Sequence, residues 1–394
     1  MPRIAVLAVA VGVAASCERT ARGPGAAGAG LAAAIAEVEA GRRAAPLIVQ
    51  PAQGGDALVT FLVESPDGRV PRIVSDVTGW GERIADDSFD LTAGTMTRVG
   101  STSWYRLEAQ VAPGARIEYL VVRGETDYGV DPHNPRQAEL HGGGPASEFV
   151  TPGYVPPREL ADPPTASAGT TVETVIGSRA LGGSRRAIVY VPFGYRDDGA
   201  YPVAVFHSGW NVARQGEAPR VLDWLIAHGE IEPIVAVFVE SVPPGDAGGR
   251  AGEPLRTFLA EELPAWLASS YGVTRRADER AILAISYGAK DALDAALAPA
   301  ETYGRLGLLI PGRRLRPADL EVVAGVRDRR LRVAILAGRY DAANIATARD
   351  VRAVLVDAGH EVEYIEVPEG HNPATWRNHL RDVLVSLFAR PRRP

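Results

Sequence analysis

The stretch AILAISYGAKDAL, residues 281–293, joins an apolar β-type run to a helix-type run through a serine with small neighbours. A strand, a tight turn and a helix in this order expose a serine hydroxyl at the edge of a parallel sheet, which makes Ser286 a candidate nucleophile. The usual G-x-S-x-G pattern has Ala284 at its first position here, and alanine fits there only if its φ is negative. A buried serine in an ordinary strand-to-helix connection therefore stays open as the alternative.

Two further groups follow the next predicted strands. Asp341 comes directly after the run VAILAGRY, and His371 comes directly after YIEVPEG. The carboxyl ends of parallel strands meet at one edge of a sheet, where catalytic groups gather. The chain order Ser286, Asp341, His371 is the order found in α/β-hydrolases. His379 is the weaker alternative base, because the surrounding WRNHL is predicted to be helical.

These three residue types together point to acyl transfer. A serine hydroxyl attacks an ester only when a neighbouring base accepts its proton, and His371 with Asp341 supplies such a base. The tetrahedral oxyanion also needs N–H donors, and the amide of Tyr287 directly follows the nucleophile. The second donor is expected from the stretch HSGWN, residues 207–211, as the amide of Ser208 or of Gly209.

Residues 173–390 alternate near-continuous apolar strands with amphipathic helices. YPVAVFHSG, PIVAVFVES and RAILAIS are typical of buried parallel strands, and PRVLDWLIAHG is typical of a covering helix. This alternation predicts a mostly parallel sheet with helices on both faces, which is the α/β-hydrolase fold class.

Residues 48–155 are predicted to be all-β. Short β-rich runs such as ALVTFLVES and ARIEYLVVRG are separated by Gly, Pro and Asp at the spacing of an immunoglobulin-like sandwich. Trp80, Trp104 and Tyr105 could stack on a sugar or aromatic ligand, and the alternative is that they pack in the core. Residues 156–172 form a proline-rich linker to the second domain.

The N-terminus has the pattern of an export signal. Residues 1–16 contain an early arginine and an apolar run that is too short to span a bilayer. They end at VAASC, which resembles the bacterial lipobox, so Cys17 is the expected lipidation site. Plain signal cleavage is the alternative. Residues 17–47 are expected to be a flexible tether, and the protein is expected to be periplasmic or at the cell surface, held to the membrane only by lipid.

Bulk composition removes several function classes. The net charge is −6 and the pI is about 5.8, so nucleic acid is not an expected partner. No H-E-x-x-H motif or cysteine cluster predicts a metal, and the single cysteine excludes an intrachain disulfide.

Lys290 is the one lysine of the chain and is expected to pair with Asp291 or Asp294. The sequence does not indicate an oligomeric state.

The order of these motifs resembles the enterochelin esterase (Fes-like) branch of the esterase D family. The likeness lies in PVAVFHSGWN, FLAEELPAWLASSYGVT, AILAISYGAKDAL and VEYIEVPEGHNPATWRNHL, and it extends over residues 50–390. The N-terminal part is similar to the sandwich modules of that family, which resemble those of glycogen-branching enzymes. The resemblance implies Ser286 as nucleophile, Asp341 as acid and His371 as base. It also implies hydrolysis of siderophore, carbohydrate or phenolic esters, small or glycan-linked, without a cofactor.

Four residues are candidates for substrate contact. Trp210 and Trp376 are expected to line the pocket, with plain packing as the alternative. Arg250 and Glu253 lie in or beside a Gly-rich loop after a predicted strand, and mobile surface charge is the alternative there. The favoured function is a serine esterase that forms an acyl-enzyme. A ligand-binding lipoprotein without turnover and an acyltransferase are the other two readings.

Overall fold

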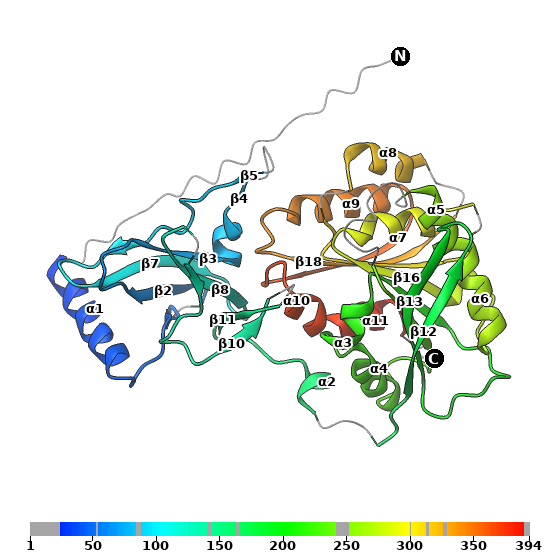
Figure 1. Ribbon diagram of the computed structural model, residues 1–394, viewed down its shortest axis with the longest axis horizontal. Coiled ribbons are helices and arrows are strands. Elements are labelled where there is room, and N and C mark those ends of the chain that lie inside the picture. The colour runs from blue at the N-terminus through cyan, green and yellow to red at the C-terminus, as the bar shows by residue number, and fades with distance from the viewer. Residues whose placement is uncertain are drawn as a thin grey trace, which may run out of the picture. The chain divides into compact units, whose positions relative to one another are not determined.

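Strand pairing divides the chain into a β-rich part and a sheet covered by helices (Figure 1). The computed structural model describes residues 24–52, 54–83, 88–125, 127–140, 143–162, 166–241, 252–299, 301–312, 315–325 and 329–389. By contacts it forms two units, residues 1–44 and residues 45–394, and the second unit holds both parts.

The β-rich part is built from two sheets. One has the order β1-β2-β7-β6, and the other has the order β10-β11-β8-β3 with β9 paired to β8. A 3-10 turn, η1 (Asp76–Gly81), follows β3, and the short hairpin β4–β5 follows η1. The strands are β1 (Leu47–Val49), β2 (Ala57–Glu64), β3 (Pro71–Ser75), β4 (Glu82–Arg83), β5 (Ser88–Phe89), β6 (Thr97–Arg98), β7 (Trp104–Val111), β8 (Arg116–Arg123), β9 (Asp127–Gly129), β10 (Gln137–Glu139) and β11 (Pro145–Val150).

Aromatic side chains from both sheets fill the space between them. Phe61 of one sheet meets Tyr119 and Phe149 of the other edge to face, with ring centroids 5.1 and 5.7 Å apart. Trp104 and Tyr105 are also buried, at 1% and 3% exposure. Core packing, rather than stacking on a ligand, is therefore the role of these two residues.

A short helix, α2 (Arg158–Ala161), lies in the proline-rich segment, and the eight-stranded sheet begins at Thr170, inside the predicted linker. The strand order is β12-β13-β15-β14-β16-β17-β18-β19, and β14 through β19 pair in parallel. The strands are β12 (Thr170–Ser178), β13 (Gly183–Val191), β14 (Val203–His207), β15 (Val235–Val239), β16 (Arg280–Ile285), β17 (Arg305–Leu309), β18 (Arg332–Gly338) and β19 (Glu361–Val367).

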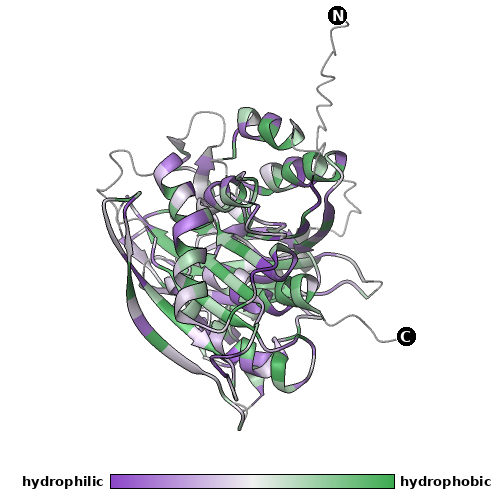
Figure 2. Cartoon of the chain, turned by 90° about the vertical axis from the view of Figure 1, so that its right-hand side faces the viewer, coloured by the Kyte–Doolittle hydropathy of each residue, from purple (hydrophilic) through white to green (hydrophobic). Residues whose placement is uncertain are grey.

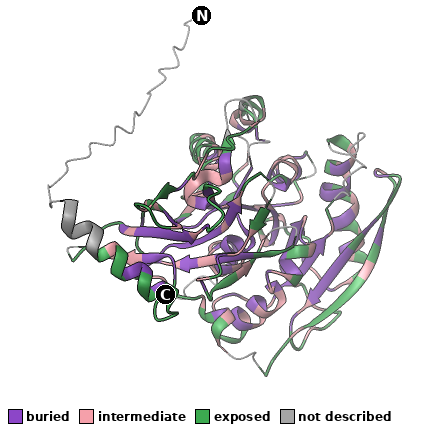
Figure 3. Ribbon diagram, turned by 60° about the vertical axis from the view of Figure 1, so that its left-hand side comes forward, coloured by how far each residue is buried: buried purple, intermediate pink, exposed green. Residues whose placement is uncertain are grey.

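Helices cover both faces of this sheet, as the apolar strands predict. Residues of α7 and α9 pack on one face, and residues of α4 and α11 pack on the other. Figure 2 shows the hydrophobic strands between these layers, and Figure 3 shows the strands buried while the outer sides of the helices are exposed. The helices are α3 (Trp210–Arg214), α4 (Ala218–Ala227), α5 (Glu253–Thr257), α6 (Leu263–Ser270), α7 (Gly288–Ala296), α8 (Pro317–Gly325), α9 (Ile345–Asp357), α10 (Pro373–Asn378) and α11 (Leu380–Phe388), with a 3-10 turn η3 (Ala277–Glu279) before β16.

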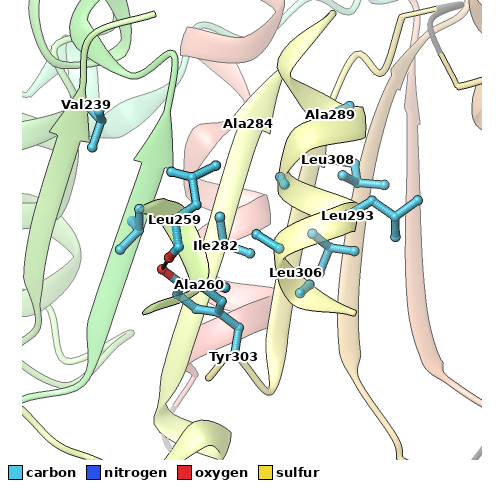
Figure 4. Close-up of a cluster of buried hydrophobic side chains, with 14 of the residues drawn as sticks. Val239, Leu259, Ala260, Ile282, Ala284, Ala289, Leu293, Tyr303, Leu306 and Leu308 are labelled. Atoms are coloured by element: carbon cyan, nitrogen blue, oxygen red, sulfur yellow. Dashed lines mark hydrogen bonds between the residues drawn. The ribbon is translucent and has the colours of Figure 1, made fainter. Parts of the chain in front are cut away.

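β16, the strand that leads to Ser286, packs in a buried core. Ile282 and Ala284 of β16 and Ala289 and Leu293 of α7 lie in one buried cluster (Figure 4). The helical stretch PLRTFLAEELPAWLASSYG, residues 254–272, contains a π-helical turn, η2 (Phe258–Glu262), between α5 and α6. The terminal helix likewise breaks at His379 into α10 and α11.

The N-terminal unit differs from the flexible tether expected over residues 17–47. Its described part contains a helix of 16 residues, α1 (Pro24–Glu39), and β1 begins at Leu47. The helix is alanine-rich, and alanine has the highest intrinsic helix propensity, which the tether interpretation undervalued. Among the described residues, none of the helices is both long and apolar enough to span a bilayer. Residues 1–16 and Cys17 lie outside the described residues.

Truncating the aromatic core of the β-rich part should destabilise it strongly. Phe61 is fully buried, so we expect Phe61→Ala to lower the free energy of unfolding by about 3–5 kcal/mol through lost burial and a residual cavity. Urea unfolding followed by tryptophan fluorescence measures the change. Phe89→Ala is the matched control, because Phe89 is 63% exposed and such surface changes cost about 0.5 kcal/mol or less. Equal losses in the two variants would contradict this core assignment.

Candidate active site

Ser286 occupies the turn between β16 and α7 with a φ of +50°, in the left-handed region. Its N–H donates to the carbonyl of Leu309 at 3.0 Å, and its carbonyl accepts the N–H of Gly312 at 3.1 Å. A non-glycine residue in this conformation costs about 1–3 kcal/mol, and such strain gathers at functional sites. The strand-turn-helix expected from the sequence is present, and it is not an ordinary connection.

Ala284 lies inside β16 and is not among the residues with positive φ. Alanine at this position is therefore unstrained, which answers the doubt that the missing glycine raises. Gly288 is the position where space is short. A Cβ there would lie 3.2 Å from both His207 Cδ2 and Ser208 Oγ, and 3.3 Å from the Cβ of Ala284.

The structure brings Ser286, Asp341 and His371 into one hydrogen-bonded series. His371 Nε2 lies 2.9 Å from Ser286 Oγ, and His371 Nδ1 lies 2.6 Å from Asp341 Oδ2. Asn344, in the turn before α9, donates through Nδ2 to Asp341 Oδ1 at 2.8 Å. Asp341 follows β18 and His371 follows β19, so adjacent parallel strands deliver both groups to one edge of the sheet.

The electrostatics around His371 favour its protonated form. Burial by itself lowers the pKa of His371, but the hydrogen bond and charge of Asp341 outweigh it, with further contributions from Glu82 and Asp76. The pKa of His371 is consequently raised above the usual 6.5. A base whose imidazolium is stabilised in this way accepts a proton from serine more readily.

His379 is placed away from the nucleophile. Its Nε2 lies 3.1 Å from Glu369 Oε1, and its Nδ1 lies 3.4 Å from Asp382 Oδ2. Burial lowers the pKa of His379, but the two carboxylates raise it to about 9. A histidine held protonated at neutral pH cannot serve as the base, which agrees with its lower ranking from sequence.

The two residues proposed for the second oxyanion donor differ in their surroundings. The N–H of Gly209 donates to the carbonyl of Val239 at 2.8 Å, so Gly209 is committed to backbone pairing and the expectation for it is wrong. Ser208 has a φ of +58°, and this turn directs the next amide back to β15. Gly209 is needed for close packing instead, since a Cβ there would lie 2.5 Å from the Cβ of Phe206. Ser208 and Tyr287 remain as candidate amides.

A cavity of about 530 Å³ opens above Ser286 and His371. The eight-stranded sheet and its loops contribute part of the lining, and η1 and the strands and loops of the β-rich part contribute the rest. The lining comprises Gly79, Trp80, Glu82, Glu118, Leu120, Leu140, Ile285, Ser286, Tyr287, Ile310, Tyr340, Asp341, Ala342, Ala343, Asn344, His371, Asn372 and Trp376. An aromatic and aliphatic wall faced by a few polar groups is the usual composition of a small-molecule site.

Of the three predicted contact residues that the structure describes, Trp376 alone is in the cavity lining, and it is only 2% exposed and packs in the core, as the packing alternative predicts. The guanidinium groups of Arg186 and Arg214 stack on the Trp210 ring at 4.1 and 5.0 Å, so this indole packs against cations rather than lining the cavity. Glu253 begins α5 with a side chain that is 83% exposed and lies 3.8 Å from Arg256, as the surface-charge alternative predicts. Arg250 lies outside the described residues.

The sequence did not single out the contribution of the β-rich part to this cavity. Trp80 lies between Gly79 and Gly81, and all three residues have positive φ. A tryptophan flanked by glycines between two strands is the signal that could have identified it, because the tight turn holds the indole out of the strand. Glu118, from the middle of β8, gave no such signal.

Lys290 forms ion pairs with Asp294 at 2.7 Å and Asp319 at 3.2 Å, and thereby links α7 to α8. The expected pairing with Asp294 is present, while Asp291 instead lies 3.3 Å from His207 Nε2. Within the described residues, no group of three or more His, Cys, Asp or Glu side chains is arranged to hold a metal ion.

Comparison with known proteins identifies related sequences. The Esterase family model, described as "Putative esterase", matches residues 178–387. The endo-1,4-beta-xylanase/feruloyl esterase of Xylanibacter ruminicola is 27% identical over 236 residues, which are 56% of this chain and 31% of that protein. The chain thus spans about a third of the length of this relative.

Solved structures share the fold. The ferric enterobactin esterase from Salmonella typhimurium matches with a TM-score of 0.70 at 18% identity, over 87% of this chain and 96% of its own. The Shigella flexneri enterobactin esterase in the presence of enterobactin matches at 0.67 and 20%, over 88% and 96%. A CE1 ferulic acid esterase from Anaeromyces mucronatus matches at 0.52 and 16%, over 59% and 96%. These likenesses establish an α/β hydrolase-type fold.

Replacing Ala284 by glycine should destabilise the protein rather than relieve strain. Glycine inside a strand loses more backbone entropy on folding, which lowers the free energy of unfolding by about 0.5–1 kcal/mol. Urea unfolding of Ala284→Gly measures this change. A more stable variant would show that alanine is strained at this position.

Proposed function

Because the chain belongs to the Esterase family and is a carboxylic ester hydrolase, we propose that it works as a serine esterase through an acyl-enzyme. Ser286 is the nucleophile, His371 the general base and Asp341 the group that orients it. The observation that carries this proposal is the continuous series from Ser286 Oγ through His371 to Asp341, with separations of 2.9 and 2.6 Å. Both distances lie within hydrogen-bond reach, as proton transfer requires.

The proposed reaction proceeds in two steps. His371 Nε2 accepts the Ser286 hydroxyl proton as Oγ bonds to the ester carbonyl carbon, and the imidazolium then protonates the departing alcohol. Water attacks the acyl-serine while His371 again accepts a proton, which releases the acid and restores the hydroxyl. Asp341 stabilises the imidazolium in both steps. The amides of Tyr287 and Ser208 are proposed to stabilise the oxyanion.

The proposed substrate is a siderophore, carbohydrate or phenolic ester, small or glycan-linked. The cavity supports this proposal, because Trp80 and Tyr287 offer aromatic surface beside Ser286. Flat rings of an acyl or alcohol group gain stacking energy from such walls. The similarity to a feruloyl esterase and to an enterobactin esterase supports phenolic and siderophore esters within this range.

The β-rich part is proposed to be an immunoglobulin-like sandwich related to carbohydrate-binding modules. Two antiparallel sheets around a shared aromatic core support this interpretation. The proposed domains are the sandwich over residues 48–155 and a catalytic domain that begins with β12 at Thr170, with the proline-rich linker between them.

Export with a lipid anchor on Cys17, to the periplasm or cell surface, is also proposed. It rests on the apolar run within residues 1–16 and on VAASC.

A fluorophosphonate probe tests the nucleophile. We expect Ser286 to be labelled, and we expect Ser286→Ala and His371→Ala to lower kcat by about 10⁴–10⁶-fold, because the triad acts as a unit. Hydrolysis of p-nitrophenyl acetate measures kcat, and mass spectrometry of the labelled protein identifies the labelled residue. Ser270→Ala, at an exposed position of α6, is the matched control, and its kcat and its labelling should equal those of the wild type.

Failure of the folded wild-type protein to react with the probe would support the ligand-binding alternative. Acyl transfer to an added alcohol in preference to water would support the acyltransferase reading.

The pH dependence tests the base. His371 must be neutral to accept the serine proton, and its pKa is raised above 6.5. We therefore expect kcat/KM to fall as the pH drops, with the acidic limb centred above pH 6.5. Initial rates with a neutral ester from pH 5 to 9 measure the limb. A profile that stays flat through this range would argue against His371 as the base.

A further inference from the structure

The loops that carry Asp341 and His371 contact the β-rich part at the residues next to the catalytic ones. Tyr340 and Ala342 flank Asp341, and Gly370 and Asn372 flank His371. The loops thus receive support from residues that lie outside the eight-stranded sheet and are distant in the sequence.

On the histidine side the contact is made by Asp76, the first residue of η1. Asn372 Nδ2 donates to Asp76 Oδ2 at 3.2 Å. The other carboxylate oxygen faces the backbone of Gly370, where a Cβ would lie only 1.8 Å from Asp76 Oδ1. The carboxylate therefore lies against the loop on both sides of His371, and only glycine fits at position 370.

On the aspartate side the contacts come from the same part of the chain. The hydroxyl of Tyr340 accepts the N–H of Ala112 at 2.7 Å. Gly79 lies close to Ala342, since a Cβ on Gly79 would be 3.3 Å from the Cβ of Ala342. Both catalytic loops are thus held from the β-rich part.

Asp76 is itself held firmly. Its Oδ1 accepts Trp80 Nε1–H at 2.9 Å and its Oδ2 accepts the Glu118 N–H at 2.9 Å, while the residue is only 2% exposed. Trp80 lines the cavity. One carboxylate therefore joins a wall of the cavity to the loop of the general base.

The charges around Asp76 come from β8, from β11 and from the loop before α10. Arg116 lies 2.9 Å from Glu118 and 2.5 Å from Glu148, and Glu369 adds a further carboxylate. Burial raises the pKa of Asp76 to about 6, although its hydrogen bonds and Arg116 oppose the rise. At neutral pH the carboxylate is ionised and accepts all three hydrogen bonds.

We propose that Asp76 is a positioning residue for catalysis, which couples the Trp80 wall of the cavity to the loop that carries His371. The inference rests on the proposed role of His371 as the base. Displacing a catalytic group by about 1 Å can cost 10²-fold in rate. Loss of the Asp76 carboxylate should therefore lower kcat more than it raises KM.

The test compares variants of the full-length protein with p-nitrophenyl acetate and with a bulky aryl-acyl ester. We expect Asp76→Asn to lower kcat about 10–100-fold on both esters, with KM changed less than about threefold, because an amide cannot accept all three bonds. Trp80→Phe, which keeps a ring but no N–H, should mainly affect the bulky ester. Asp198→Asn, at an exposed aspartate with 71% side-chain exposure, is the matched control.

A second variant answers the objection that Asp76→Asn might unfold. Asn372 Oδ1 caps α10 by accepting the Thr375 N–H at 3.0 Å, and serine caps helices equally well. Asn372→Ser thus keeps a cap acceptor and removes the amide donor to Asp76, together with the 3.5 Å contact from Arg116 Nη1, and we expect it to lower kcat about tenfold. Thermal melting of each variant shows whether it is folded. If Asp76→Asn is unfolded, the kcat of Asn372→Ser tests the positioning role of Asp76.

The pH profile separates positioning from general loss of structure. His371 faces the charges of Asp341, Glu82 and Asp76, which each raise its pKa. Asp76→Asn should move the acidic limb of kcat/KM to lower pH, whereas Asn372→Ser, which keeps the charge, should leave the limb in place. If both variants retain wild-type kcat while His371→Ala is inactive, the role of Asp76 is refuted and the proposed function stands. If His371→Ala is active, the proposed function itself fails.

Discussion

Parallel pairing of β16, β17, β18 and β19 is the constraint on which the rest of the site depends. Each strand in this series hydrogen-bonds to the next in register, so all their carboxyl ends reach the same edge of the sheet. Ser286 follows β16, Asp341 follows β18 and His371 follows β19. β16, β17 and β18 are almost wholly buried, so a shifted register would disrupt their packing against the helices on both faces. β19 lies at the edge of the sheet and is more exposed, and its register is held by pairing with β18 along its whole length.

The packed sheet also supports a strained residue at its edge. The left-handed φ of Ser286 is unfavourable for a side chain. It persists because backbone hydrogen bonds to Leu309 and from Gly312 hold the turn from the neighbouring strand and loop. Small residues make the turn compatible with its surroundings, most clearly at Gly288, where a side chain would crowd His207 and Ser208. Strain at Ser286 is thus offset by the core beneath it.

The β-rich part completes the site that the sheet begins. It places Trp80 and Glu118 in the lining of the cavity and sets Asp76 against the loop of His371. Buried carboxylates at this contact are costly unless they are paired and hydrogen-bonded. Burial raises the pKa of Glu118 to about 7 despite Arg116. Such a cluster has little margin for rearrangement, because moving any member leaves a buried polar group without its partner.

Local sequence signals were sufficient to single out the candidate triad, the helix-covered parallel sheet and the β-rich character of the N-terminal part. Apolar runs, turn residues and the chain order of Ser286, Asp341 and His371 each depend on a short stretch of chain, so periodicity and spacing reveal them. The second oxyanion donor was less accessible, because the hydrogen bond from Gly209 to Val239 depends on how two strands end together. Trp210 failed as a cavity residue for a similar reason, since Arg186, whose guanidinium lies nearest its ring, comes from β13, although Arg214 belongs to the same helix as Trp210. Asp76 and Asn372 are 296 residues apart, and no local pattern links them. The sequence by itself determined the main strands and helices and the chain order of Ser286, Asp341 and His371, whereas only the tertiary structure decided what surrounds them, because long-range packing places side chains that no short stretch of chain can place.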